Sequence, residues 1–80
     1  MHISDTIIRM NKYLVVIEKT STGYSAYSPD VPGCVSTGHT KQAVKRNMRE
    51  AIEFHLEGLR SEGEEIPVPH SSSAYVPVGA

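Results

Sequence analysis

One long helical pattern limits the folds open to this chain of 80 residues. Apolar residues recur at intervals of three and four between residues 44 and 59, and at about 100° per residue they form a single stripe. Thr40 precedes the pattern and predicts an N-cap, because its hydroxyl can accept a hydrogen bond from the first turn. A helix with one apolar face needs a second layer to cover it. The stripe consists of Val44, Met48, Ala51, Ile52, His55 and Leu59.

Three β-prone segments precede the helix and predict that second layer. Residues 13–19, 24–28 and 34–38 are short and rich in β-branched or aromatic side chains. The small polar residues at 20–23 predict a hairpin loop that ends with Gly23 at positive φ. Ala74–Val78 predicts a last short strand or a docking arm. We therefore expect an α+β fold, in which a three-stranded antiparallel sheet packs against one long helix in β-β-β-α-β order.

The length of the chain allows one domain. We expect a flexible N-terminal extension at residues 1–11, the domain at 12–70, and a C-terminal arm or short strand at 71–80. A chain this short buries only about 60% of the surface that its unfolded form exposes. Its small core predicts self-association, as a dimer or a tetramer.

Composition excludes several classes of function. The net charge of -1 and the pI of about 6.4 give no overall basic field, which argues against a dedicated nucleic-acid binder. A single cysteine supplies neither a disulfide nor a zinc cluster. No apolar run approaches the roughly 20 residues that span a bilayer, and the N-terminus lacks the features of a signal peptide. We expect a cytoplasmic protein with no membrane association, no metal and no cofactor.

A proline-rich turn follows the second predicted strand and holds the only cysteine. Pro29 and Pro32 lack an N–H and end the strand, and Gly33 predicts a reversal of the chain. Paired with a histidine, Asp30 or Cys34 would support catalysis. However, no complete catalytic constellation can be assembled from the sequence. The turn is better explained as architecture, with Asp30 bonding its own backbone first and contacting a partner second, and with Cys34 as a small buried hydrophobe.

The charges of the helix are ordered against its dipole. Basic residues fill its first half and acidic residues its second, whereas the macrodipole favours the opposite order. A solvated face is the simpler explanation. The functional explanation is that the acidic end meets a basic protein. The residues predicted to bind such a partner are Asp30, Glu50, Glu53, Glu57, Glu64 and Glu65.

Three sequence stretches together resemble the HicB family of antitoxins. They are Tyr-Ser-Pro-Asp-Val-Pro-Gly-Cys at 27–34, Thr-Gly-His-Thr at 37–40, and the helix segment from Ala51 to Leu59. The resemblance covers residues 12–70. It implies a partial ribonuclease H-like fold that has lost nuclease function. It also implies that the domain is not an enzyme, and that it binds and neutralises a small HicA-type toxin that cleaves mRNA.

The chain departs from this family in one respect. Many HicB-type antitoxins carry a C-terminal DNA-binding module, but here few residues follow Pro69. We therefore expect no direct DNA binding. Two alternatives stay open. One is an orphan oligomeric domain with a structural or regulatory role. The other is a residual metal-dependent nuclease, although Glu18, Asp30 and Glu50 lie on different elements without a metal-binding spacing.

Overall fold

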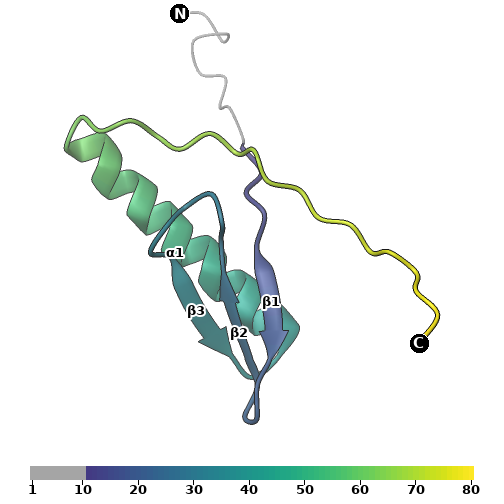
Figure 1. The fold of residues 1–80 in the computed structure, drawn as a ribbon. Helices are drawn as coiled ribbons and strands as arrows, with labels where there is room; N and C mark the ends of the chain where they lie inside the picture. Colours follow the sequence, from purple (N-terminus) through teal and green to yellow (C-terminus); the bar gives the residue numbers. More distant parts are fainter. Residues whose placement is uncertain (1–10) are drawn as a thin grey trace, which may run out of the picture.

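The structure, a computed structural model, describes residues 11–80. Within that range the chain forms three strands and then one helix: β1 (Val16–Lys19), β2 (Tyr24–Tyr27), β3 (Val35–Gly38) and α1 (Lys41–Ser61). The strands form one antiparallel sheet, and α1 lies across one of its faces (Figure 1). The predicted α+β class and the order of the first four elements are confirmed. The predicted extension at 1–11 falls, apart from its last residue, outside the described residues.

The strand register separates a covered face of the sheet from an open one. The order is β1-β2-β3, and Ala26 in the central strand pairs with Ile17 on one side and Ser36 on the other. Because successive residues of a strand point to opposite faces, the buried Ala26 marks the face under α1. Tyr27 and Val35 pair in the next row, and both are exposed. The second face of the sheet is therefore open to solvent.

Two consecutive turns carry the chain from β2 to β3. The Val31 N–H donates to the Ser28 carbonyl at 3.2 Å, and the Cys34 N–H donates to the Val31 carbonyl at 3.2 Å. Proline occupies the second position of each turn, where its fixed φ is favoured. Gly33 has φ of 90° at the third position of the second turn, a conformation that favours glycine. Together the turns place the Val31 side chain fully inside the core.

The hairpin between β1 and β2 closes with a hydrogen bond of 2.8 Å from the Thr20 N–H to the Gly23 carbonyl. The predicted positive φ at Gly23 is wrong, because the described glycines with positive φ are Gly33 and Gly63. Gly23 is required instead because there is no room for a side chain at this position. A Cβ at Gly23 would lie 2.5 Å from the carbonyl oxygen of Gly38, so only glycine lets the hairpin loop approach the end of β3.

Both ends of α1 are capped. As predicted, the Thr40 hydroxyl accepts a hydrogen bond of 3.0 Å from a backbone N–H of the first turn. At the other end, Gly63 adopts φ of 71°. Its N–H donates to the Arg60 carbonyl at 3.1 Å, and the Glu64 N–H donates to the Leu59 carbonyl at 2.8 Å. This pair of bonds is the Schellman motif, which satisfies carbonyls that the helix leaves free.

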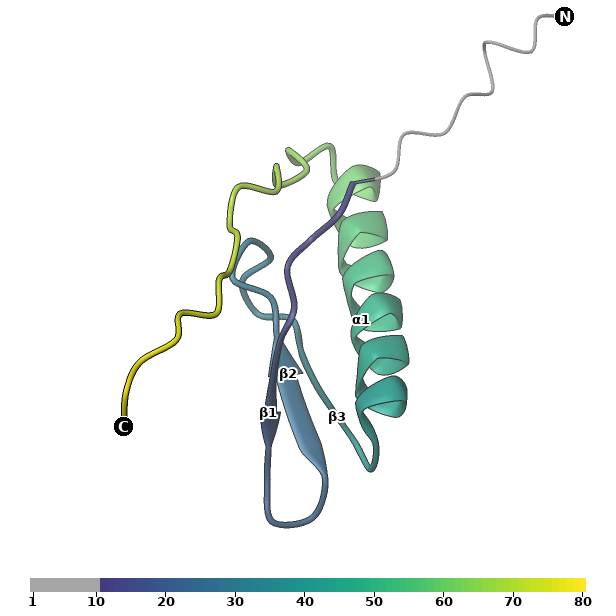
Figure 2. The ribbon, with the colours of Figure 1, turned by 90° about the vertical axis from the view of Figure 1, so that its right-hand side faces the viewer.

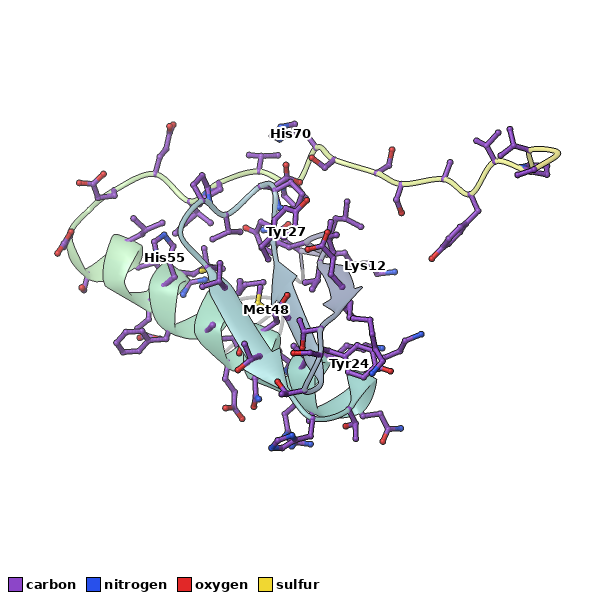
Figure 3. The ribbon with its side chains drawn as sticks, turned by 60° about the horizontal axis from the view of Figure 1, so that its bottom comes forward. Lys12, Tyr24, Tyr27, Met48, His55 and His70 are labelled. Carbon is purple, nitrogen blue, oxygen red and sulfur yellow. The ribbon has the colours of Figure 1, made fainter. Side chains whose placement is uncertain are left out.

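The core lies between α1 and the covered face of the sheet. Met48 is fully buried at its centre and lies between the helix and the sheet in Figure 3. Partly buried apolar side chains pack against this core, namely Tyr13, Ile17, Leu59 and Ile66. The predicted stripe therefore faces the sheet as expected. The buried apolar residues are Ala26, Val31, Cys34, Val44, Met48, Ile52 and Leu56.

After α1 the chain runs to residue 80 without regular secondary structure. Its first part lies against the domain, since the Tyr13 hydroxyl donates to the Pro67 carbonyl at 2.6 Å. The fourth strand predicted at Ala74–Val78 is not formed within residues 11–80. Figure 2 shows this end of the chain leaving the domain on the side of the sheet away from α1. Within residues 11–80 the arm is paired with no strand, and Pro77 has no N–H to offer.

Candidate functional surfaces

A buried carboxylate holds the C-terminal segment to the proline-rich turn. Asp30 Oδ2 accepts hydrogen bonds from the backbone N–H groups of His70 at 3.0 Å and Ser71 at 2.9 Å. The Ser71 hydroxyl donates to Oδ1 at 2.7 Å, and His70 Nδ1 lies 3.2 Å from the same oxygen. The Asp30 side chain is 1% exposed. We call this arrangement the Asp30 clasp.

The clasp favours the charged form of Asp30. The hydrogen bond from the Ser71 hydroxyl holds the pKa of the Asp30 carboxyl below its ordinary value of 3.8, and the two backbone N–H groups act in the same direction. Burial alone would raise this pKa, because it penalises the charged form. The hydrogen bonds outweigh burial because each of them is made to the ionised carboxylate. A protonated His70 adds a further favourable charge.

The clasp gives Asp30 a role that the sequence did not indicate. Asp30 was expected to bond its own turn and then to contact a partner, but its carboxylate bonds residues 40 and 41 positions later in the chain. A protein partner reaches this carboxylate only after the C-terminal segment moves away. The sequence signal that was available was the Ser-rich stretch after His70, which supplies donors but no indication of their partner.

The acidic residues of the helix lie on an exposed surface. Glu50, Glu53 and Glu57 are all exposed, and their spacing of three and four residues places them on adjacent turns. We call these three residues the acidic helix face. The exposed pair Arg49–Glu53, at 3.5 Å, contributes little to stability because solvent screens it. Beside the acidic helix face, Phe54 is 83% exposed, a large apolar side chain without cover from its own chain.

The remaining predicted contact residues are placed differently. Glu64 and Glu65 follow the C-terminal cap of α1 and are exposed. They extend the acidic surface beyond the helix end. Asp30 is buried and does not belong to that surface. The structure thus groups five of the six predicted residues on or after α1, whereas their role in binding stays a prediction.

Cys34 is placed as a core residue. Its side chain is buried, and the thiol lies 3.8 Å from the Ala51 carbonyl. Burial raises the pKa of the Cys34 thiol above 9.0, which disfavours the reactive thiolate. His55 lies on the helix and is half-buried. Within residues 11–80, no three side chains of His, Cys, Asp or Glu gather in a way that could hold a metal ion.

An apolar groove runs between β1 and α1. The helix packs chiefly against β3 and β2, so the covered face of the sheet is left partly open beside β1. The resulting space has a volume of about 540 Å³. We call it the β1–α1 groove. Its apolar walls are formed by Tyr13, Leu14, Val15, Ile17, Ile52 and Leu56, and Lys45, Arg49, Glu53 and Arg60 contribute charged groups to it.

Comparison with known proteins identifies the family. Residues 13–77 match the model of the HicB-like antitoxins of bacterial toxin–antitoxin systems. The described residues form three strands and one helix, and acidic side chains lie on the exposed surface of that helix. The chain belongs to the HicB-like antitoxin family. Within residues 11–80 no helix is both long enough and apolar enough to cross a membrane.

Individual relatives support this assignment. An uncharacterised 14.9 kDa protein of Haemophilus phage HP1 is 42% identical over 64 residues, which cover 80% of this chain and 48% of the phage protein. A UPF0150 protein of Thermoplasma acidophilum is 40% identical over 57 residues, or 70% of this chain and 83% of that protein. The chain therefore spans about half the length of the phage relative.

Two solved structures share the fold. A chain in a HicA3 and HicB3 toxin–antitoxin complex superimposes with a TM-score of 0.64 at 37% identity, covering 75% of this chain and 70% of that chain. A crystal structure of the antitoxin HicB3 gives a TM-score of 0.65 at 37% identity, covering 75% of this chain and 44% of that chain.

Proposed function

We propose that this protein binds and neutralises a small, basic HicA-type toxin. The observation that carries the proposal is the similarity, over 75% of this chain, to a chain of the HicA3 and HicB3 complex. The acidic helix face supplies negative charge to meet such a partner, and Glu64 and Glu65 extend it. Complementary charge of this kind steers association and selects among partners. Because the resemblance implies a toxin that cleaves mRNA, the cytoplasm is the compartment in which the pair would act.

Phe54 offers an apolar contact, which charged residues do not provide. Energetically dominant interface residues are usually aromatic, with polar groups around them that exclude water. Phe54 is exposed on α1 with Glu50 and Glu57 within one turn on either side. We expect its ring to enter an apolar pocket of the partner while the glutamates pair with basic residues around that pocket.

The test is co-expression with any small basic protein that is encoded beside this gene. The expected result is a stable complex and relief of toxicity. Glu57→Lys should weaken binding by about tenfold. Glu18→Lys is the matched control, because it makes the same charge change on an exposed residue of β1. If no complex forms with any such neighbour, and no toxicity is relieved, the proposal fails.

A second proposed function is self-association, as a dimer or a tetramer. The observation in its favour is the number of large apolar side chains that this single chain leaves exposed. A second copy would cover some of them and would enlarge a core that is small for a free domain. The mass in solution, measured by light scattering over a range of concentrations, tests this. The exposed set comprises Tyr27, Val35, Phe54, Val68, Tyr75, Val76 and Val78.

A further inference from the structure

The geometry points to the β1–α1 groove as the docking site for Ala74–Val78 of a second copy of this chain, so that two copies exchange their C-terminal arms. The inference rests on the self-association proposed above and gives it a site. Its test does not require the toxin. Because each copy would donate one arm and receive one, the exchange would close as a twofold-symmetric dimer.

The chemistry of the arm matches the groove. Tyr75, Val76 and Val78 are 104%, 73% and 81% exposed, so nearly all their apolar surface lies in water in the single chain. Residues 71–80 contain no charged side chain. A neutral, apolar segment has nothing to gain from the acidic helix face. It suits the β1–α1 groove, whose walls are mainly aliphatic and aromatic.

The dimensions agree as well. Five extended residues span about 17 Å, and the groove wall on this side runs from Tyr13 to Ile17, which is also a stretch of five residues. β1 is an edge strand whose only strand neighbour in the described sheet is β2. An added strand is the usual way in which an extended segment covers such an edge.

Alternation along the arm gives it an orientation. If Val76 and Val78 face α1, then Tyr75 and Pro77 face the opposite side. The two valines would then contact the apolar walls formed by Ile52 and Leu56. Proline is tolerated in an edge strand when its nitrogen faces away from the neighbouring strand. Pro77 fits that position when Val76 and Val78 bond to β1.

The arm does not suit the groove of its own chain. The Asp30 clasp fixes Ser71, so that only Ser72 and Ser73 precede the apolar part of the arm. The arm leaves on the side of the sheet away from α1 (Figure 2), whereas the groove lies on the α1 side. To enter the groove of its own chain, the arm would have to turn around the edge of β1 directly after these two serines. The arm of a second copy is not tethered to this Asp30 and can approach along β1.

The first test compares two aspartates in the arm. Val76→Asp would place a carboxylate against the apolar walls formed by Ile52 and Leu56, and we expect it to weaken dimerisation at least tenfold by light scattering. Gly79→Asp is the matched control, because it adds the same charge beyond the apolar segment, where the glycine has no neighbour within 4 Å. Its dimerisation should stay within twofold of the unchanged protein. Equal behaviour of the two variants would overturn the inference.

The second test uses disulfide formation between copies. A size-tagged Val76→Cys chain mixed with an Arg49→Cys chain should give a crosslinked heterodimer, because Arg49 lines the groove. Phe54→Cys is the control partner, since it is exposed on α1 but does not line the groove. Cys34 is buried and is present in every variant, so any background crosslinking through it is the same in each mixture. Crosslinking to Phe54→Cys as strong as to Arg49→Cys would overturn the inference.

The outcomes separate the proposals from one another. A dimer that is indifferent to Val76→Asp leaves self-association standing and rejects arm exchange. A monomer at every concentration rejects both. In either case binding of the toxin is measured separately, and Glu57→Lys tests it without touching the arm or the groove.

Discussion

Ser71 donates to both oxygens of the Asp30 carboxylate, through its backbone N–H at 2.9 Å and its hydroxyl at 2.7 Å. The two residues lie 41 positions apart in the sequence. Their contact joins the turn between β2 and β3 to the segment that follows α1. The C-terminal end of the domain is therefore held in place by the Asp30 side chain rather than by pairing of a strand.

Replacing the clasp carboxylate should free the C-terminal segment. Asp30→Asn keeps the size of the side chain but removes its charge, and an NH2 donor replaces one of the two accepting oxygens. We expect the amides of His70 and Ser71 to exchange with deuterium about tenfold faster, while the amides of α1 stay protected. Ser71→Ala, which removes only the hydroxyl bond, should give a smaller change. Unchanged exchange at residues 70 and 71 in Asp30→Asn would contradict the role assigned to the clasp.

The clasp should weaken in acid. The folded-state pKa of Asp30 lies below its ordinary value of 3.8, so the stability it contributes is fully present above that value. It is lost as the pH falls through the lowered pKa and the carboxylate becomes protonated. We expect the side-chain carboxyl carbon signal of Asp30 to titrate below pH 3.8 in NMR spectra of the unchanged protein. Asp30→Asn should lack this transition, and a titration of that carboxyl carbon above pH 3.8 would contradict the prediction.

Alanine variants at Met48 and Phe54 should separate effects on stability from effects on partner binding. Met48→Ala opens a cavity at a fully buried position and should lower the free energy of unfolding by about 2–5 kcal/mol. Phe54→Ala changes an exposed side chain and should alter stability by no more than about 0.5 kcal/mol. Denaturant titration measures both. If Phe54 anchors the partner, the same Phe54→Ala variant should bind it about 30-fold more weakly.

Two glycines should respond to alanine in opposite directions. Gly58 lies within α1 with no atom within 4 Å of a built Cβ, so Gly58→Ala should raise the free energy of unfolding by about 0.5–1 kcal/mol. Gly38 is different, because its Cβ would lie 2.6 Å from the backbone nitrogen of Val44. Gly38→Ala should lower stability by about 1–3 kcal/mol. Thermal unfolding of both variants under one condition checks this, and a shift of the same sign in both would contradict it.

The Cys34 thiol should react slowly. Burial raises its pKa above 9.0 and shields it from reagents. At pH 8 we expect alkylation in the folded protein to be at least about tenfold slower than in denaturant, because reaction needs both opening and deprotonation. Equal rates in the folded and unfolded protein would show that the thiol is accessible.

Local chemistry made much of the fold predictable. The helix followed from the spacing of its apolar stripe and from the Thr40 cap, and the structure places both as expected. The prolines predicted the turns because they remove N–H groups that a ladder needs. The ends of the strands were harder to predict. Residues 13–15 are as β-prone as β1, but β2 ends at Tyr27, which pairs with Val16, so residues 13–15 have no partner in β2.

What the sequence could not reveal was contact between distant residues. The Asp30 clasp depends on where residue 71 passes after the helix, and no local pattern encodes that path. Gly23 illustrates the same limit, because its reason is the approach of Gly38 rather than its own φ. The predicted fourth strand was wrong for the single chain because a strand needs a paired neighbour, and the arm runs away from the sheet without pairing with β1. Glu50, Glu53 and Glu57 were expected on the helix and lie on α1, but their role in binding stays a prediction.

The clasp also imposes an order in time. A ribosome makes Asp30 well before Ser71, so the growing chain holds this carboxylate hydrated, with its turn only half supported, until the helix has emerged. The turn is completed only once residues 70 and 71 have been synthesised. Any cut that removes residues 70 and 71 would return the domain to that unfinished stage.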